Sequence, residues 1–272
     1  MRHALLITLL IFPTVSLAAD DVVFREDFEH FNRKNWDDIS DKAGAIDIVE
    51  GGHQGKCLQI TAKRGQNTGG HLFKLIQPGL DQAYVRFYVK FDKEHGYIHH
   101  FFHVCAYNPP TRYPQGGAGD KPRGDERFTT GVELWGFWGK YPAPGAWNLY
   151  SYWCEMKGSR DGKYWGNSFA PDPPVQVVRD KWICMELMIK CNSAPDKADG
   201  EQALWIDGKQ VGDWKDIRWR TDPKLRIDGL WVLDYITETA DNQNRVKNPD
   251  VNRVWFDDIV VSKSYVGPTI GQ

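Results

Sequence analysis

The chain has 272 residues and a formal net charge of only −2 at pH 7, from 34 basic and 36 acidic side chains. A nearly neutral chain lacks the global positive field that attracts nucleic acid or anionic membranes, so we expect neither as a partner. An anionic ligand would have to be held by local positive groups. The length allows one large hydrophobic core or two small ones.

The first 18 residues have the pattern of a signal peptide. Arg2 precedes an apolar run at residues 4–15, and small residues follow at Ser16 and Ala18. Signal peptidase accepts such a pattern, so we expect cleavage after Ala18 and a secreted or periplasmic protein. The run is about a dozen residues long, whereas a membrane-spanning helix needs roughly 20, so we expect no membrane span.

The remainder alternates apolar and polar residues with a period of two, in short runs separated by Gly, Pro, Asn and Asp. This pattern is typical of β-strands. Asp207-Gly208 stands between two such runs and predicts a hairpin turn, and no long helix is evident. We therefore expect residues 19–272 to form one all-β sandwich or jelly-roll domain. The clearest strands are 83–91, 128–135, 147–157, 182–191 and 254–262.

Two connections are longer than a compact domain needs. Residues 106–126 are rich in Pro and Gly, and residues 237–252 form the second long connection. Loops of this length commonly bind ligands. The first carries Tyr107, Asn108 and Arg112, which suit a lid that contacts sugars.

Five cysteines occur in the part that would be exported, where thiols are usually oxidised. An odd number leaves at least one unpaired, and the spacings match neither a zinc ribbon nor a CxxC redox pair. A structural bridge or simple burial is expected. The five are Cys57, Cys105, Cys154, Cys184 and Cys191.

Three stretches carry a family resemblance. They are GGHLFKLIQPGLDQAYVRFYVKFD at 69–92, WICMELMIKCNSAPDKADGEQALWIDGKQV at 182–211, and VWFDDIVVSKSYVGP at 254–268. They resemble the jelly-roll polysaccharide lyases of the alginate, glucuronan and heparin lyase kind. The resemblance implies a concanavalin A-like β-sandwich of two antiparallel sheets that acts on a polysaccharide. Where those lyases place a Lys- and Gly-containing strand on the catalytic face, this chain has GYIHHFFHVCAYNPP, so their catalytic residues do not transfer.

Side-chain alternation assigns the histidine-rich segment at 98–105 to two faces, because successive strand side chains point to opposite sides. Ile98 belongs to the more apolar set, which is expected to face the core and to take His100 with it. His99 and His103 are then expected in a groove.

The same reasoning applies to the strands at 128–135 and 147–157. Glu133 and Trp135 are expected to face the groove. In the second strand, the set containing Trp153, Glu155 and Lys157 is assigned to the groove and the set containing Tyr150 and Tyr152 to the other face.

A lyase needs a group that neutralises the uronate carboxylate, a base for the C5 proton and an acid for the leaving oxygen. Imidazole and tuned carboxylates can move protons near neutral pH, and flat aromatic rings stack on sugars. The candidates for the three roles are Arg112 or Lys157, His99 or His103, and Tyr150 or Tyr152. The expected substrate-binding residues are Tyr107, Asn108, Arg112, Arg127, Trp135, Trp138 and Trp153.

Metal binding has two candidate places. His99 and His103 are four residues apart on one expected strand, about 13 Å between their Cα atoms, which disfavours a shared zinc ion. Asp27, Glu29 and Asp257 resemble the acids of paired edge strands that bind a structural calcium in many such jelly rolls. Unbound surface acids are the alternative. No organic cofactor is expected.

Three functions remain open. The first is a polysaccharide lyase that cleaves a uronate-containing glycan by β-elimination. The second is a glycoside hydrolase that uses Glu133 and Glu155. The third is a carbohydrate-binding module without chemistry, against which the histidine cluster argues. The sequence leaves the glycan and the oligomeric state open.

Overall fold

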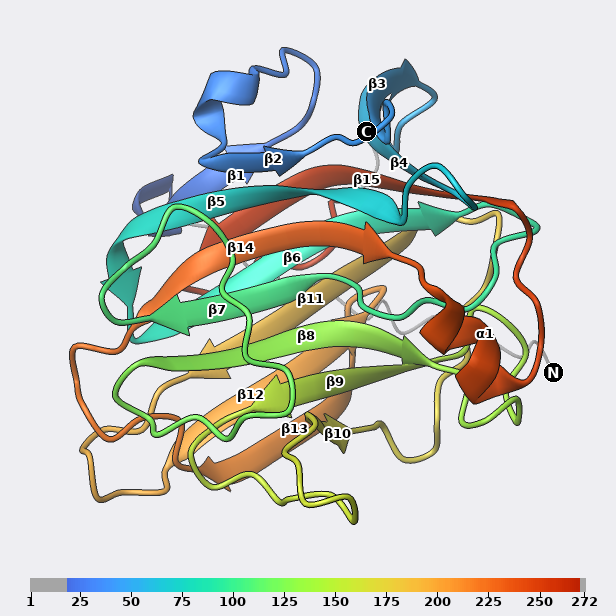
Figure 1. Cartoon of the computed structure of the whole chain (residues 1–272). Coiled ribbons are helices and arrows are strands. Elements are labelled where there is room, and N and C mark those ends of the chain that lie inside the picture. Colours follow the sequence, from blue (N-terminus) through green and yellow to red (C-terminus); the bar gives the residue numbers. More distant parts are fainter. Residues whose placement is uncertain (1–18, 270–272) are drawn as a thin grey trace, which may run out of the picture.

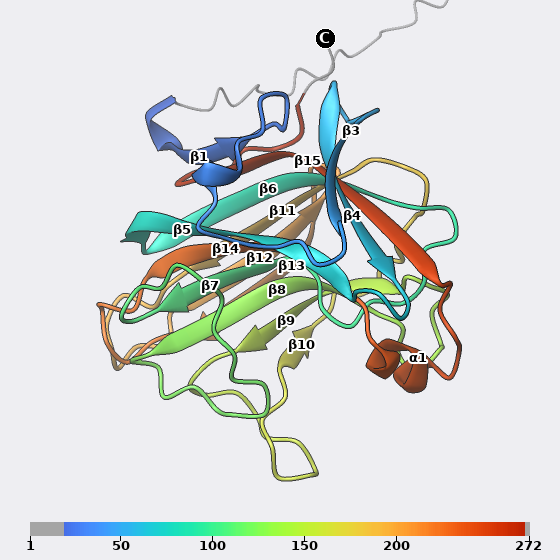
Figure 2. The same ribbon diagram turned by 45° about the horizontal axis from the view of Figure 1, so that its top comes forward.

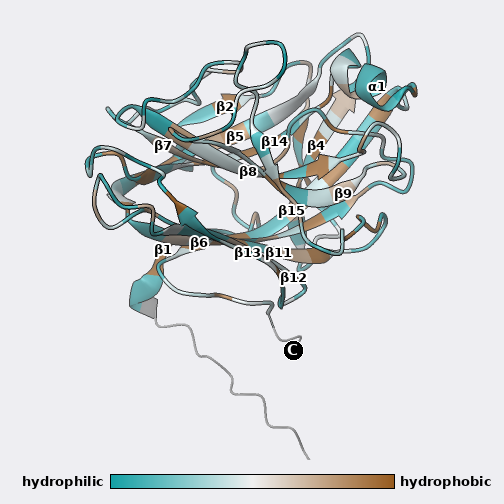
Figure 3. Ribbon diagram, turned by 90° about the horizontal axis from the view of Figure 1, so that it is seen from below, coloured by the Kyte–Doolittle hydropathy of each residue, from teal (hydrophilic) through white to brown (hydrophobic). Residues whose placement is uncertain are grey.

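The computed structural model describes residues 19–269, and the predicted signal peptide falls outside this range. Two antiparallel β-sheets pack face to face (Figures 1 and 3). The first sheet contains, in spatial order, β13 (Lys209–Ile217), β12 (Gly200–Ile206), β11 (Ile183–Lys190), β6 (Gln82–Phe91), β15 (Val251–Ser262), β4 (Lys56–Lys63) and β3 (Ile46–Glu50), with β1 (Val22–Glu26) paired to β15.

The second sheet carries the candidate site. One short α-helix, α1 (Glu238–Asn244), lies beside the adjoining ends of β8 and β9 (Figure 1). In the described part of the chain, no helix is long and apolar enough to cross a membrane. The strands of this sheet are, in spatial order, β10 (Asn167–Phe169), β9 (Ala146–Tyr152), β8 (Arg127–Trp135), β7 (His103–Tyr107), β14 (Ile227–Tyr235), β5 (Gly69–Leu80) and β2 (Asp38–Ser40). Two single-turn 3₁₀ helices cover Ala19–Asp21 and Arg33–Asn35.

The predicted jelly-roll sandwich of two antiparallel sheets is confirmed. The first and last strands also pair as expected, with Arg25 of β1 opposite Val260 of β15 (Figure 2). Asp207 and Gly208 both adopt positive φ, 49° and 78°, in the turn between β12 and β13. The two-residue signal therefore identified this hairpin for the correct physical reason.

Aromatic side chains fill the space between the sheets. Phe87 on β6 stacks on Phe102 from the segment before β7, with ring centroids 3.9 Å apart, and Phe256 on β15 packs against Phe101 at 5.2 Å. All four rings are fully buried. The packing of Phe101 and Phe102 thus anchors the histidine-bearing segment at 98–103 to the core.

All five cysteines are buried and unpaired. Burial raises the pKa of Cys57, Cys105, Cys184 and Cys191 to about 12, so these thiols stay protonated. The sequence predicted either a structural disulfide or simple burial of the thiols, and the structure shows simple burial.

Replacing Phe87 by Ala is expected to lower the free energy of unfolding by about 3–5 kcal/mol, because it removes a buried ring and leaves a cavity. Denaturant unfolding of the purified chain measures the change. Phe137, which is 36% exposed, is the matched control, and Phe137→Ala should cost much less. Equal losses for the two variants would contradict the packing described above.

Candidate active site

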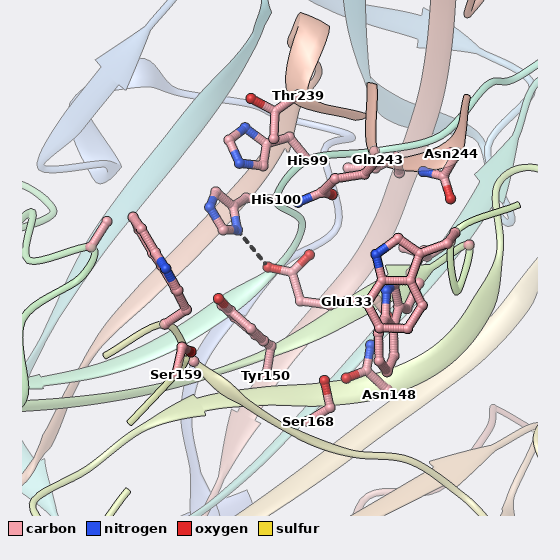
Figure 4. Close-up of a pocket in the computed structure, with 18 of the residues that line it drawn as sticks. His99, His100, Glu133, Asn148, Tyr150, Ser159, Ser168, Thr239, Gln243 and Asn244 are labelled. Carbon is pink, nitrogen blue, oxygen red and sulfur yellow. Dashed lines mark hydrogen bonds and ion pairs between the residues drawn. The ribbon is translucent and has the colours of Figure 1, made fainter. Parts of the chain in front are cut away.

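A cavity of about 650 Å³ opens on the outer face of the second sheet. Its walls come from β8, β9, β10, α1, the segment before β7 and the loop between β9 and β10 (Figure 4). The described residues that line it are Ile98, His99, His100, Ala118, Glu133, Leu134, Trp135, Gly136, Trp138, Asn148, Tyr150, Tyr152, Ser159, Trp165, Gly166, Ser168, Thr239, Gln243 and Asn244.

Glu133 is the centre of a buried hydrogen-bond network. Its Oε1 accepts from His103 Nε2 at 2.7 Å and from His100 Nδ1 at 3.1 Å, and its Oε2 accepts from the backbone N–H of Phe101 at 3.0 Å. Burial opposes ionisation of the carboxyl, but the bonds from the two histidines outweigh it and lower its pKa to about 2. Burial also disfavours a charged His100, yet the bond to Glu133 prevails and raises the pKa of that imidazole.

A glycine makes room for this network. Gly131 lies opposite both His103 and Tyr150 in the sheet. A Cβ atom at Gly131 would stand 2.5 Å from the His103 ring, so any other residue would displace the imidazole from Glu133.

His99 has a different environment from His100. Its ring stacks on His100 at 4.4 Å and on Tyr235 at 5.3 Å, and its Nδ1 lies 2.8 Å from the Thr237 hydroxyl. Burial and the neighbouring His100 lower the pKa of His99 to about 4. The cavity therefore contains two neighbouring imidazoles whose pKa values move in opposite directions, His99 downward and His100, beside Glu133, upward (Figure 4).

Two tyrosines from β9 complete the polar wall. Tyr150 has its ring 6.0 Å from that of His100 and 5.6 Å from that of Tyr152. Burial is the main cause that raises the pKa of Tyr150, so its hydroxyl carries a proton at neutral pH. Both tyrosines predicted as candidates for the acid line the cavity.

The face assigned to His100 was wrong. His100 lines the cavity, whereas Phe101 is buried in the core next to Phe102. The reason is that β7 begins only at His103, and His100 forms one isolated bridge with Tyr235. Strict alternation does not hold in an irregular segment, so the parity argument failed there.

The faces of β9 were also exchanged. Tyr150 and Tyr152 line the cavity, whereas Trp153 packs into the core against Phe169 and Trp219. The strand ends at Tyr152, five residues before the predicted end.

Two further candidates therefore lie outside the cavity. Glu155 forms an ion pair with Arg218 at 3.2 Å, and Lys157 is exposed. Glu133 and Glu155, the pair expected for hydrolysis, do not meet.

The first long loop contributes less than expected. Tyr107 is buried under the loop and its hydroxyl accepts from the Gln115 N–H. Asn108 donates to the Asp125 carbonyl, and Arg112 pairs with Asp37 at 3.3 Å. Arg127 donates to two loop carbonyls, at Gly117 and Asp120. None of these four lines the cavity, and the loop reaches it through Ala118.

Trp135 and Trp138 do line the cavity, as predicted, and Trp138 is 60% exposed. Sequence reasoning missed the three residues from α1, although the long connection at 237–252 marked this region. It also missed the rest of the β9–β10 wall, which has no pattern that separates it from an ordinary loop. The missed residues include His100, Asn148, Ser159, Trp165, Ser168, Thr239, Gln243 and Asn244.

His100, His103 and Glu133 are the described residues that come near enough together to hold a metal ion, with their ligand atoms within 4.8 Å of one another. Two histidines and a carboxylate form a common set for transition metals. The hydrogen bonds of 2.7 and 3.1 Å into one oxygen account for the same arrangement without an ion.

The calcium site expected at three acids stays a prediction. Asp27, Glu29 and Asp257 do not form a ligand cluster in the described chain. The Glu29 carboxylate accepts a hydrogen bond from the Lys56 N–H, and the Asp257 carboxylate accepts one from the Gln54 N–H. Both carboxylates therefore stabilise the backbone at 54–56. Burial raises the pKa of Asp257 to about 7.

Comparison with known proteins agrees with this fold. No family model matches the sequence, and the search of curated proteins gives no significant match. Solved structures with the same fold include an alginate lyase from a Chlorella virus, at TM-score 0.66 and 14% identity, covering 90% of this chain and 100% of that one. The endo-β-1,4-glucuronan lyase of the fungus Trichoderma reesei matches at TM-score 0.58 and 17% identity, covering 89% and 96%.

A third match is alginate lyase Aly36B in complex with an alginate tetrasaccharide, at TM-score 0.62 and 13% identity, covering 90% of this chain and 98% of that one. Identities this low show the fold. The likeness to jelly-roll polysaccharide lyases inferred from three sequence stretches is confirmed at that level.

Replacing Glu133 by Gln is expected to lower the free energy of unfolding by roughly 1–3 kcal/mol near pH 6, because two charge-assisted hydrogen bonds lose their ionised acceptor. The pKa of Glu133 is lowered, so its contribution is present above the unfolded value near 4.5 and is lost as pH falls toward 2. The pKa of His100 is raised, so its contribution is complete below 6.5 and is lost as pH rises through the folded value.

Denaturant unfolding across this pH range measures the difference between wild type and variant. Glu155→Gln is the control, since its exposed ion pair should contribute less than about 1 kcal/mol. A difference for Glu133→Gln that did not change with pH would contradict the charged network.

Proposed function

We propose that the chain is a polysaccharide lyase that cleaves a uronate-containing glycan by β-elimination. The observation that carries the proposal is the meeting in one cavity of His99, with a lowered pKa, His100, with a pKa raised by Glu133, and the Tyr150 phenol. These are the base, the charge neutraliser and the acid that the reaction requires. The shared fold with alginate and glucuronan lyases supports the proposal.

His100 takes the role that the sequence had left to Arg112 or Lys157. As a cation at the cavity wall, it pairs with the uronate carboxylate and stabilises negative charge that develops at C5. Glu133 acts through His100 and is a positioning residue, because it keeps the imidazole protonated and fixes its orientation.

His99 is the base and Tyr150 the acid. In the tautomer that this role requires, His99 Nδ1 donates its proton to the Thr237 hydroxyl 2.8 Å away, and Nε2 is free to take the C5 proton. The C5–H electron pair becomes the C4–C5 double bond, the C4–O bond breaks, and the Tyr150 hydroxyl protonates the leaving oxygen. The proton on His99 returns to Tyr150 through solvent after the products leave.

The hydrolase alternative loses its basis in the geometry. Tyr152 lies opposite Thr129, four residues or roughly 13 Å along the strand from Glu133, and Glu155 follows in a turn outside the cavity, where it pairs with Arg218. Glycosidase carboxylates stand about 5 to 9.5 Å apart. Glu133 is also the one carboxylate among the described lining residues, and its lowered pKa does not suit a general acid.

We also propose that the protein acts outside the cytoplasm, since residues 1–18 have the charged, apolar and small-residue regions of a signal peptide. A polymeric substrate that cannot enter the cell is consistent with this. The N-terminal sequence of the mature protein would begin at Ala19 if cleavage follows Ala18.

Tyr150→Phe and His99→Ala are each expected to lose about 10²- to 10⁴-fold in kcat, because each removes a proton-transfer group. The assay follows ultraviolet absorbance of the unsaturated product on uronate-containing polysaccharides, alongside reducing ends. Tyr113→Phe is the matched control, since Tyr113 is 60% exposed and outside the cavity.

Each outcome discriminates between functions. Reducing ends without unsaturated product would show hydrolysis, and tight binding without any product would show a binding module. Full activity in Tyr150→Phe at equal folded fraction would overturn the assignment of the acid.

A further inference from the structure

The cavity is poor in positive charge. None of the described residues that line it is Lys or Arg, and the lining contains one carboxylate, Glu133, hydrogen-bonded to His100 and His103. A polymer with a carboxylate on every sugar would bring several negative charges into this cavity, where only His100 faces them. Unpaired charges in a confined site are costly.

Two of the cations near the rim are already engaged. Arg127 donates to the carbonyls of the covering loop. The Lys163 ammonium stands over the Trp165 ring, 5.4 Å from its centroid. The Asp161 carboxylate accepts a hydrogen bond of 2.8 Å from the indole N–H of Trp165. Asp161 thus places a negative charge close to Lys163, which weakens the attraction of that lysine for a carboxylate.

Aromatic rings occupy both ends of the cavity instead. Trp135 lies opposite Ala146 at the start of β9, and Trp138 contacts Trp135 at 5.3 Å. Trp165 precedes β10, whose Asn167 lies opposite Ser151 at the other end of β9. From Ala146 to Ser151 the strand rises roughly 17 Å, so the two aromatic ends are separated by several sugar rings.

Between these ends the remaining polar groups suit hydroxyls. The side-chain Nδ2 of Asn148 donates to the backbone carbonyl of Glu133 at 3.3 Å. The buried Oδ1 of Asn148 is an acceptor that has no hydrogen-bond partner among the described residues. An acceptor attracts a sugar hydroxyl and repels a carboxylate. Ser168, Thr239 and Gln243 add uncharged groups to the same wall.

Building on the lyase function proposed above, we propose that the substrate is a heteroglycan in which an isolated uronate is flanked by neutral sugars, and that polyuronates are poor substrates. The uronate lies at His100 between His99 and Tyr150, and the neutral neighbours stack on Trp138 and Trp165. Aromatic stacking requires no charge on the stacked sugar, and apolar ring faces favour it.

The test compares two groups of polysaccharides with the full mature chain. Deacetylated gellan represents uronates separated by neutral sugars, and alginate, glucuronan and polygalacturonate represent polyuronates. We expect kcat/KM for unsaturated product to be at least about tenfold higher on gellan, equivalent to the loss of one favourable ionic contact. Trp165→Ala and Trp138→Ala should raise KM on gellan more than they lower kcat.

A charge insertion tests the same inference in the opposite direction. Gln243 is exposed on α1 and lines the cavity. Gln243→Arg should raise kcat/KM on polyuronates relative to gellan. Gln210→Arg, on an exposed position of β13 in the other sheet, is the matched control and should leave the ratio unchanged.

The outcomes separate this inference from the proposed function. Unsaturated product formed equally well or better from the polyuronates would overturn the substrate class and leave the lyase intact. Reducing ends without unsaturated product would overturn the lyase itself. No product from either group would overturn both.

Discussion

The candidate site depends on one buried carboxylate. Glu133 accepts two hydrogen bonds from the irregular segment before β7 and one from His103, the first residue of β7, and these bonds fix where His100 and His103 point. Burial disfavours the ionised form of an enclosed carboxyl group, so the charged form is stable here only because its partners donate hydrogen bonds to it. The same interaction therefore anchors the segment, sets the charge on His100 and leaves His99 as the neutral member of the pair.

The two adjacent histidines show how environment separates identical side chains. His100 contacts a carboxylate, whereas His99 contacts a hydroxyl and a cationic neighbour, and their pKa values move in opposite directions. Such a separation of acid and base roles by environment is common at catalytic sites. It follows here from their different partners, since His100 hydrogen-bonds to Glu133 whereas His99 hydrogen-bonds to Thr237.

The sequence predicted the scaffold better than the site. Alternation and the Asp207-Gly208 turn were sufficient for the sandwich and for the pairing of β1 with β15, because regular strands obey a period of two. The same rule failed at His100, where no ladder forms, and at Trp153, which follows the end of β9. Loop residues such as Arg112 were chemically suitable, but nothing in a sequence of Pro and Gly indicates which side chains a loop turns inward.

The pairing of β1 with β15 has a practical consequence. Both strands belong to the sheet that does not carry the cavity, and β1 pairs there with the C-terminal part of β15 (Figure 2). An anchor, affinity tag or second module joined at either end would emerge from the back of the molecule and leave the cleft open to solvent. The protein could be immobilised on a solid support through its termini and still meet long, insoluble polymers with its active face.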